Sequence, residues 1–388
     1  MIGLFFKKTI KFDYRLNIGV ISKDSYIILG IGEGLNMKKL RVGIIGAGSL
    51  SEVHFDAYTN NQNVELVAVC DLIEDRATAK AEKYSISDVY TDYHEMLKST
   101  ELDAVSIVTW NNTHKDIAIA ALDAGKHVLC EKPLCLNHEE ALEIKAATER
   151  SDKKFMIGYV RRHASSINVL KGLIDKGSLG EIYYAKASNL RRLGNPGGWF
   201  SDKSRSGGGP LIDIGVHVID LLWYLMGRPK VKTVSANTYN NLGNRTNINN
   251  LSFYKAADYS PENDVEDLAN ALIRFENGAS LMVDVSFALH VKNDQSSAVI
   301  FGDKGGAEID PLLVIVHEEN DTILNSTPQI DHTSFNFTDG FQNEINHFVN
   351  SCLAGEDPIG GIDDGVEMMK ILTAIYESAE KKQEVVFS

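Results

Sequence analysis

The sequence of 388 residues predicts an α/β fold in which a doubly wound parallel sheet is followed by an α+β domain with a mostly antiparallel sheet. Up to residue 157, short apolar and β-branched runs alternate with helical patterns, as in parallel βαβ units. Beyond that point strand patterns follow one another with few helices between them. Hydrophobic residues form 44% of the chain and charged residues 24%, which excludes a disordered or low-complexity protein.

The first part of the chain is expected to form the parallel sheet. Apolar runs predict strands at residues 40–45, 65–70, 104–109, 127–130 and 154–157. Helical patterns separate these runs, and Asn137 with Glu140 has the spacing of a capping box for a helix that ends near Arg150. Because strands and helices alternate, we expect helices on both faces of this sheet.

The second part of the chain is expected to form the antiparallel sheet. Strand patterns lie at residues 181–189, 265–275, 279–287 and 297–301, and Asn277-Gly278 is typical of a hairpin turn. The polar, turn-rich stretch 241–263 predicts a long loop. Helices at 340–353 and 365–381 and a short strand at 385–386 complete the chain, so we expect domains at 38–157 and 158–388.

The charge balance and the cysteines exclude several classes of protein. The net charge is −14, and an acidic surface repels phosphate backbones, so we expect no nucleic-acid partner. No stretch approaches the roughly 18 consecutive apolar residues of a membrane span. The four cysteines form no C-x-x-C pair, which argues against a thiolate zinc site and a disulfide framework. We therefore expect a reduced, cytoplasmic protein without a metal.

Residues 1–37 differ from the rest of the chain and are treated as an extension. Residues 1–36 are weakly basic, whereas the remainder is strongly acidic. Met37 directly precedes two lysines and the first predicted strand, so it is a candidate for the biological start. Two interpretations stay open: an over-extended reading frame, or a natural and poorly ordered arm.

A glycine motif follows the first strand and opens a helix. Gly46 permits the tight turn, and Gly48 lets a pyrophosphate approach the backbone at the positive end of the helix dipole. The third position holds Ser51, where such fingerprints have Gly or Ala. Asp71 closes the next strand 23 residues after Gly48, where its carboxylate would accept hydrogen bonds from a ribose. These features predict a Rossmann domain that binds NAD rather than NADP through the loop of Gly46, Ala47, Gly48, Ser49 and Leu50, and through Asp71.

Two further clusters carry side chains suited to catalysis. Lys132, in a Glu-Lys-Pro segment, follows a predicted strand at the sheet edge where ligands bind. After a run of glycines, Asp213 and His217 lie four residues apart, which in an α-helix places them on one face. An imidazole beside a carboxylate can accept a hydroxyl proton. A structural His–Asp pair is the alternative for this spacing, and a metal site lacks an evident third ligand.

Taken together, these segments resemble the glucose–fructose oxidoreductase / inositol dehydrogenase / MocA (Gfo/Idh/MocA) oxidoreductases over residues 38–388. The shared segments are VGIIGAG (42–48), TWNNTH (109–114), EKPL (131–134), GYVRR (158–162) and D-x-G-x-H-x-x-D (213–220). The resemblance implies a C-terminal open sheet that often mediates oligomers, hence a homo-oligomer (dimer or tetramer). It implies the catalytic set Lys132, Asp213 and His217. It also implies cofactor contacts from Thr109, Trp110, Asn111, His114, Glu131 and Lys132, with Trp110 replacing the proline usual in the family.

The loop of residues 189–200 is the candidate wall of the substrate pocket. Arg191 and Arg192 can donate hydrogen bonds to hydroxyls, and Trp199 can stack on a sugar face. The Arg-Arg-x-Gly-x-Pro pattern resembles members that oxidise glucosides at the 3-hydroxyl. Tyr159 and Arg161 are further candidates, alongside Lys132, Asp213 and His217. The alternative is that Trp199 packs in the fold and the arginines are a solvated face.

The sequence therefore predicts an NAD-dependent dehydrogenase acting on a secondary alcohol of a sugar, glycoside or cyclitol. His217 would accept the hydroxyl proton, Lys132 would polarise the oxygen, and Asp213 would orient His217. Whether His217 or Lys132 is the proton acceptor stays open. The alternatives are an inositol dehydrogenase, and a non-catalytic NAD-dependent sugar sensor on the same fold.

Overall fold

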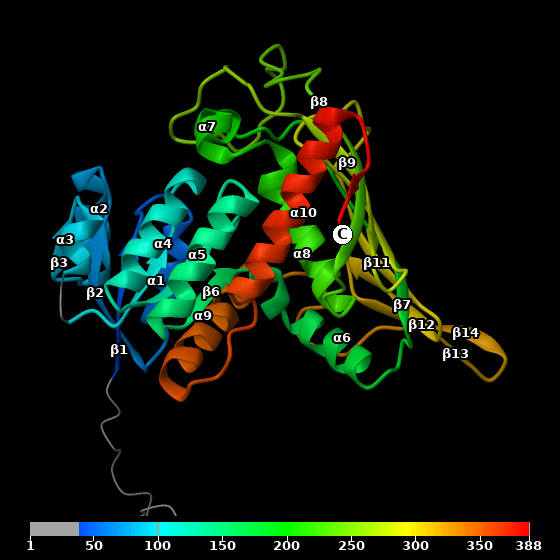
Figure 1. Ribbon diagram of the computed structural model, residues 1–388, viewed down its shortest axis with the longest axis horizontal. Coiled ribbons are helices and arrows are strands. Elements are labelled where there is room, and N and C mark those ends of the chain that lie inside the picture. The colour runs from blue at the N-terminus through cyan, green and yellow to red at the C-terminus, as the bar shows by residue number, and fades with distance from the viewer. Residues whose placement is uncertain (1–38, 99–100, 388) are drawn as a thin grey trace, which may run out of the picture. The chain divides into compact units, whose positions relative to one another are not determined.

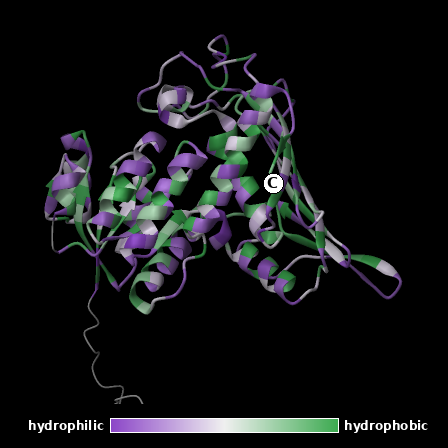
Figure 2. Cartoon of the chain, viewed as in Figure 1, coloured by the Kyte–Doolittle hydropathy of each residue, from purple (hydrophilic) through white to green (hydrophobic). Residues whose placement is uncertain are grey.

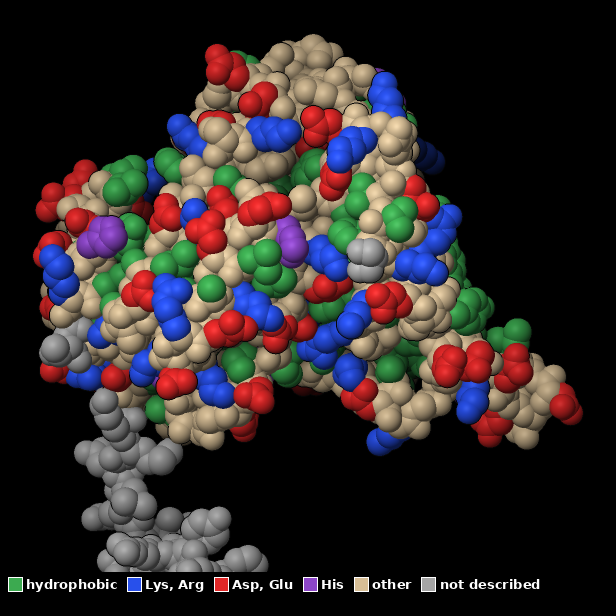
Figure 3. All heavy atoms as spheres, in the orientation of Figure 1, with side chains coloured by type: hydrophobic (Ala, Val, Ile, Leu, Met, Phe, Trp, Pro, Cys, Tyr) green, Lys and Arg blue, Asp and Glu red, His purple; other side chains and the backbone are tan. Residues whose placement is uncertain are grey.

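A computed structural model describes residues 39–98 and 101–387, and residues 40–388 form one compact unit. The expectations for residues 1–36 and the start at Met37 lie outside the described residues. Two sheets organise the unit, with helices α8 and α10 between them (Figure 1). On the face shown in Figure 3, Asp and Glu side chains are interspersed with Lys and Arg.

The first sheet is parallel and has the strand order β3-β2-β1-β4-β5-β6. The order reverses between β1 and β4, which is the switch point where such sheets bind ligands. Its strands are β1 (Leu40–Ile45), β2 (Val64–Cys70), β3 (Asp88–Tyr90), β4 (Ala104–Ile107), β5 (His127–Glu131) and β6 (Phe155–Gly158). Its helices are α1 (Ser51–Thr59), α2 (Glu74–Tyr84), α3 (Tyr93–Leu97), α4 (His114–Asp123) and α5 (His138–Ser151).

These elements confirm the parallel sheet expected from the sequence. Every residue of β4 and β6 is buried, because helices cover both faces. Asn137 caps α5 by accepting a hydrogen bond from the Glu140 amide at 2.9 Å, while the Glu140 carboxylate accepts from the Leu136 amide. The sequence did not predict β3 and α3, since they are too short to produce a clear apolar pattern.

The second sheet is mostly antiparallel and has the order β14-β13-β12-β11-β7-β10-β9-β8-β15. Only the β7–β10 pair in this described sheet is parallel. The strands are β7 (Ile182–Leu190), β8 (Val231–Tyr239), β9 (Leu268–Phe275), β10 (Ser280–Ser286), β11 (Gln295–Gly302), β12 (Gly305–Asp310), β13 (Val314–Glu319), β14 (Thr322–Ser326) and β15 (Val385–Val386).

The expected antiparallel sheet is confirmed, together with the hairpin at Asn277-Gly278 that joins β9 and β10. No helix or strand lies between β8 and β9, which confirms the long loop expected at 241–263. The sequence missed β8 and β12 to β14. In β14 every residue is exposed, so that strand shows no alternation of apolar and polar residues.

Helices cover one face of the second sheet. This layer is built by α8 (Val216–Leu225) and α10 (Ile362–Lys381). In β9 alternate residues, from Ala269 to Phe275, are buried beneath these helices. The opposite face carries Met282 and Phe301, each 40% exposed, and Phe301 stacks on Tyr184 with ring centroids 5.5 Å apart.

The C-terminal half also contributes to the core of the first sheet. Helix α9 (Phe337–Ala354) packs against α1, and Gln342 Nε2 donates a hydrogen bond to the Ala57 carbonyl oxygen at 3.0 Å. Ile345 and Phe348 of α9 are buried in one cluster with Val42 of β1. The remaining α-helices of the described chain are α6 (Ser165–Asp175) and the short α7 (Lys203–Ser206).

One helical stretch of the described chain, residues 203–225, is long and apolar enough to cross a membrane by length and composition. Its most apolar window is 89% buried inside the fold. Nearly all residues of α8 are buried, and this helix is largely apolar in Figure 2. The apolar part of this stretch, α8, is therefore a core helix between the two sheets.

Candidate active site

The glycine loop joins β1 to α1 and has open space in front of it. Gly46 has φ of +101°, and an added Cβ would lie 2.2 Å from the Val108 carbonyl oxygen. At Gly48, by contrast, an added Cβ would meet no heavy atom within 4 Å. Leu50, at the N-cap of α1, gives no side-chain cap, and Ser51 Oγ donates a hydrogen bond to the Gly48 carbonyl oxygen at 2.7 Å. The loop is thus shaped for an anionic group at the helix N-terminus, with Ser49 and Leu50 exposed.

Asp71, at the end of β2, lies beside this loop. Its Oδ2 accepts a hydrogen bond from the Ala47 amide at 2.7 Å, and its Oδ1 accepts from the Ile73 amide at 2.8 Å. Leu72 follows with 80% of its surface exposed, so no cation occupies that position. A carboxylate in this place suits ribose hydroxyls and repels a 2′-phosphate.

Lys132 and Asp213 meet at the carboxyl end of β5. Lys132 Nζ donates hydrogen bonds to the backbone oxygen of Asp213 at 2.9 Å and to its Oδ1 at 3.1 Å. The two side chains are 13% and 20% exposed. The pair therefore holds an ammonium group at the edge of the first sheet, partly shielded from water.

Asp213 and His217 do not share a regular α-helix. Residues Leu211–Gly215 form a π-helix, and His217 lies in the first turn of α8. A π-helix has i→i+5 hydrogen bonds, so the regular α-helix assumed for the spacing of these two residues is not formed here. No hydrogen bond links them in the described chain. The carboxylate expected to orient His217 is bonded to Lys132 instead.

Glu266 holds the start of this π-helix, and sequence reasoning missed it. Its carboxylate accepts hydrogen bonds from the amides of Gly209 and Leu211 at 2.9 and 3.2 Å, and from the Tyr376 hydroxyl at 2.9 Å. Burial raises the pKa of Glu266. In the sequence, Glu266 is marked only as an acidic residue at the start of a strand pattern, and many residues without a role in a site share that feature.

His217 is surrounded by positive charge. Burial, followed by the charges of Lys132, Arg161 and Arg191, holds the pKa of His217 well below its ordinary value. Asp310 pairs with Arg161 at 2.7 and 2.8 Å. Arg191 has no ion pair within the described residues. The imidazole is consequently neutral near pH 7 and able to accept a proton.

The other predicted arginine and the tryptophan lie in the loop that follows β7. Arg192 is exposed and donates a hydrogen bond to the Lys292 carbonyl oxygen at 3.0 Å. Trp199 is half-buried and packs on Phe200, with ring centroids 3.9 Å apart. The Trp199 amide donates to Asp258 Oδ2 at 3.2 Å. Part of the Trp199 surface therefore remains free to meet a ligand.

The segment after β4 is tied to its neighbours on both sides. Asn111 Nδ2 donates a hydrogen bond to the Ser206 carbonyl oxygen at 2.7 Å. The buried ring of His114 lies between the carbonyl oxygens of Pro133 and Thr109, at 2.8 and 3.2 Å, and burial lowers its pKa. Asn111 and His114 were expected to contact the nicotinamide ribose. Their side-chain nitrogens instead lie against backbone carbonyl oxygens, so these two residues stabilise the fold.

Glu131 and Tyr159 are further predicted site residues that are buried in the protein. Glu131 is 4% exposed, and its carboxylate is 2.8 Å from His54 Nε2 of α1 and accepts a hydrogen bond from the Lys132 amide at 3.2 Å. Tyr159 is 1% exposed and lies under the guanidinium of Arg162 at 4.8 Å. Neither side chain offers a surface to a ligand.

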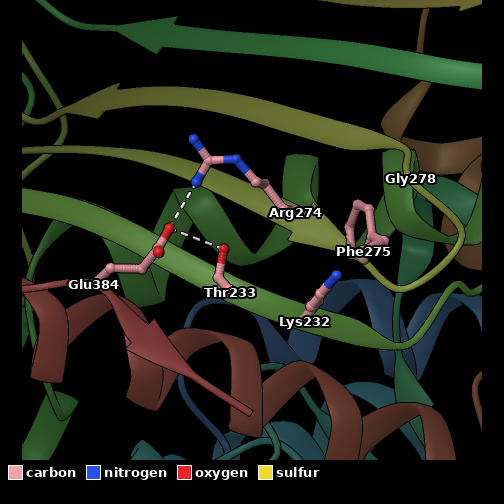
Figure 4. A pocket seen from close by; sticks show the side chains of 6 residues that line it. All are labelled: Lys232, Thr233, Arg274, Phe275, Gly278 and Glu384. Atoms are coloured by element: carbon pink, nitrogen blue, oxygen red, sulfur yellow. Dashed lines mark hydrogen bonds and ion pairs between the residues drawn. The ribbon is translucent and has the colours of Figure 1, made fainter. Parts of the chain in front are cut away.

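A cavity of about 300 Å³ lies elsewhere, at the edge of the second sheet beside β8 and β9 (Figure 4). Its lining comprises Lys232, Thr233, Arg274, Phe275, Gly278 and Glu384. The Glu384 carboxylate accepts hydrogen bonds from Thr233 and Arg274 across it, at 2.9 and 2.6 Å. None of the predicted site residues lines this cavity, so we do not assign it to the active site.

Comparisons with known proteins identify the family of this chain. The model of the oxidoreductase family with an NAD-binding Rossmann fold (GFO_IDH_MocA) matches residues 40–159, and the model of the C-terminal alpha/beta domain of that family matches residues 171–387. The chain belongs to the Gfo/Idh/MocA oxidoreductases. It is an oxidoreductase whose cofactor is NAD, as the sequence predicted.

Relatives of this Gfo/Idh/MocA oxidoreductase include named dehydrogenases. D-Glucoside 3-dehydrogenase of Escherichia coli is 35% identical over 88% of this chain and 95% of its own length. Myo-inositol 2-dehydrogenase of Thermotoga maritima is 27% identical over 89% of this chain and 98% of its own. A solved levoglucosan dehydrogenase in complex with NADH has the same fold, with a TM-score of 0.79 and 24% identity over 90% of this chain and all of that one.

Proposed function

We propose that this oxidoreductase oxidises a secondary alcohol of a sugar or glycoside, with Lys132, Asp213 and His217 as its catalytic set. The observation that carries the proposal is the Lys132–Asp213 pair at the carboxyl end of β5, beside a neutral His217. A fixed ammonium group and an unprotonated base are what removal of a hydroxyl proton requires. A sensor protein has no need of this set.

The cofactor fits the loop between β1 and α1. Gly46 makes the tight turn, Gly48 leaves the backbone open to a pyrophosphate, and Asp71 would bind the adenosine ribose and favour NAD over NADP. When bound, NAD supplies the hydride acceptor. Trp110 and Thr109, at the end of β4, would lie on the nicotinamide side. Asn111 and Glu131 would position the residues around the nicotinamide through their hydrogen bonds to the backbone of Ser206 and Lys132.

The protein's own groups handle the proton. His217 Nδ1 or Nε2 accepts the proton of the substrate hydroxyl, since burial and then the surrounding cations lower the pKa of the ring and keep it neutral. Lys132 Nζ donates a hydrogen bond to the substrate oxygen and stabilises its developing negative charge. Asp213 positions the ammonium group of Lys132 rather than the imidazole, because its carboxylate is bonded to Nζ.

The substrate class that we favour is a D-glucoside oxidised at the 3-hydroxyl. The 35% identity to D-glucoside 3-dehydrogenase and the Arg191-Arg192 loop support it. Arg191, without a carboxylate partner in the described chain, can donate hydrogen bonds to sugar hydroxyls. A cyclitol is the second candidate, on the strength of the likeness to myo-inositol 2-dehydrogenase.

A substrate panel tests this proposal directly. NADH formation is measured with methyl glucosides, myo-inositol and N-acetyl sugars, and the position of the new ketone is assigned by NMR. We expect turnover with methyl glucosides and a product oxidised at carbon 3. NAD binding without turnover on any member of the panel would favour the sensor function and overturn the proposal.

We also propose a cytoplasmic homo-oligomer, a dimer or tetramer, that assembles through the open face of the second sheet. Exposed Met282 and Phe301 on that face support the interface. All four cysteines are free thiols, as is usual in a reducing compartment. Sedimentation of the protein and of Phe301→Glu tests the interface: a monomeric parent protein would refute it.

A further inference from the structure

An arginine of α7 links the two halves of the protein beside the candidate active site. The guanidinium carbon of Arg205 lies 4.8 Å from the centroid of the Trp110 ring. Arg205 also pairs with Asp202 at 3.2 Å and with Asp258, in the long loop, at 3.5 Å. Figure 1 shows α7 next to the loop that runs from β8 to β9. We propose that Trp110, Arg205 and Asp258 form a second sugar subsite, which binds the ring attached to the glucoside that is oxidised.

This group of side chains is built into the fold from both sides. Asp202 caps α7 by accepting a hydrogen bond from the Ser204 amide at 3.0 Å, and this fixes the helix that carries Arg205. The Trp199 amide holds Asp258 at 3.2 Å. At Gly198, with φ of +58°, an added Cβ would lie 2.3 Å from Asp258 Oδ1, so the two loops pack closely there.

The subsite adjoins the proposed catalytic set. Trp110 follows Thr109 just after β4, and the His114 ring lies between the carbonyl oxygens of Thr109 and of Pro133, the residue after Lys132. Asn111 Nδ2 donates to the Ser206 carbonyl oxygen, next to Arg205. The chain then runs through the glycines to Asp213. The segments that carry Trp110 and Arg205 therefore border the segments that carry Lys132 and Asp213.

The exposed chemistry fits an uncharged sugar ring. Trp110 is 37% exposed, and the side chains of Arg205 and Asp258 are 40% and 39% exposed, so each keeps surface for a ligand. An indole face packs on the C–H face of a sugar, while guanidinium and carboxylate groups bond its hydroxyls. Asp202 and Asp258 offset the charge of Arg205, which disfavours a phosphate or carboxylate substituent. By contrast, the third tryptophan, Trp223, is buried.

The inference rests on the proposed function and narrows its substrate class to disaccharides and longer glucosides. The experiment compares kcat/KM for methyl glucosides and for glucosyl-glucose disaccharides of both anomers, in the parent protein, Arg205→Ala and Asp258→Asn. We expect the parent to prefer a disaccharide by about tenfold, the effect of one stacking contact with a hydrogen bond. We expect the ratio of the two kcat/KM values to fall towards one in both variants.

Arg150→Ala is the matched control, since Arg150 pairs with Asp123 on the surface of α5. It should leave the ratio unchanged. An equal loss of kcat/KM for both substrates in the variants would mean that Trp110, Arg205 and Asp258 only hold the loops together, and it would overturn the subsite. A parent protein that does not prefer the disaccharide would also overturn it. If the parent oxidised neither substrate, the proposed function would fail by itself. Calorimetry on the NAD-bound protein would then decide the subsite: tighter binding of the disaccharide supports it, and equal or absent binding rejects it.

Discussion

Replacing the two glycines of the dinucleotide loop one at a time should separate folding from cofactor binding. At Gly46 the backbone has φ of +101°, and an added Cβ would lie 2.2 Å from the Val108 carbonyl oxygen. At Gly48 an added Cβ would meet no heavy atom within 4 Å. Only Gly46 is therefore needed by the protein without its cofactor.

Gly46→Ala is expected to lower the free energy of unfolding by about 3 kcal/mol. A side chain in the left-handed region costs roughly 1–2 kcal/mol, and moving a Cβ away from the backbone oxygen adds roughly 1–3 kcal/mol of overpacking strain. Gly48→Ala should stay within about 0.5 kcal/mol of the parent, because the added methyl group contacts nothing. It should nevertheless weaken NAD binding at least about tenfold, since the methyl group occupies the approach of the pyrophosphate.

Urea unfolding of the NAD-free protein and fluorescence titration with NAD measure the two effects. Gly172→Ala serves as the control, because Gly172 lies in α6 and an added Cβ there also meets no atom within 4 Å. It should keep NAD affinity and raise the free energy of unfolding by up to about 1 kcal/mol, because alanine favours a helix interior over glycine. The reasoning is refuted if Gly48→Ala destabilises the NAD-free protein as much as Gly46→Ala, or binds NAD as tightly as the parent.

Four further predictions follow from the electrostatics and the site. In a pH–rate profile, the acid limb of kcat/KM should lie well below the ordinary histidine pKa of about 6.5, because burial and nearby cations lower the pKa of His217. An acid limb at about 6.5 would contradict this. Lys132→Ala and His217→Ala should each reduce turnover ~100- to 10,000-fold and keep the NAD dissociation constant within several-fold, with non-additive losses in the double variant. Asp71→Ala should weaken NAD more than NADP, as paired dissociation constants would show. Burial lowers the pKa of His163 to about 3, so the unfolded state binds more protons below about pH 6.5, and the free energy of unfolding should fall by ~2 kcal/mol between about pH 7 and pH 5. His163→Gln should remove that part of the slope in urea unfolding.

The sequence determined the fold class because local patterns carry it. Apolar runs alternating with helical patterns specify a parallel sheet, and Gly46, Gly48 and Asp71 follow strands at fixed spacings, so their places could be predicted from the order of elements. Lys132 was predictable for the same reason, since it follows β5 at the edge where ligands bind. Short or wholly exposed strands such as β3 and β14 could not be predicted, because they leave no periodic pattern.

Only the tertiary structure decided how the site residues are paired. The spacing of Asp213 and His217 assumed an α-helix, whereas the chain forms a π-helix there, held at its start by Glu266 from a distant part of the chain. The Asp213 carboxylate bonds to Lys132, which follows β5 of the first sheet, and not to His217. Likewise, α9 buries its apolar side chains against the first sheet, and Glu131 meets His54 of α1 instead of a ligand. Such pairings depend on packing between segments far apart in sequence, and no local pattern of residues encodes them.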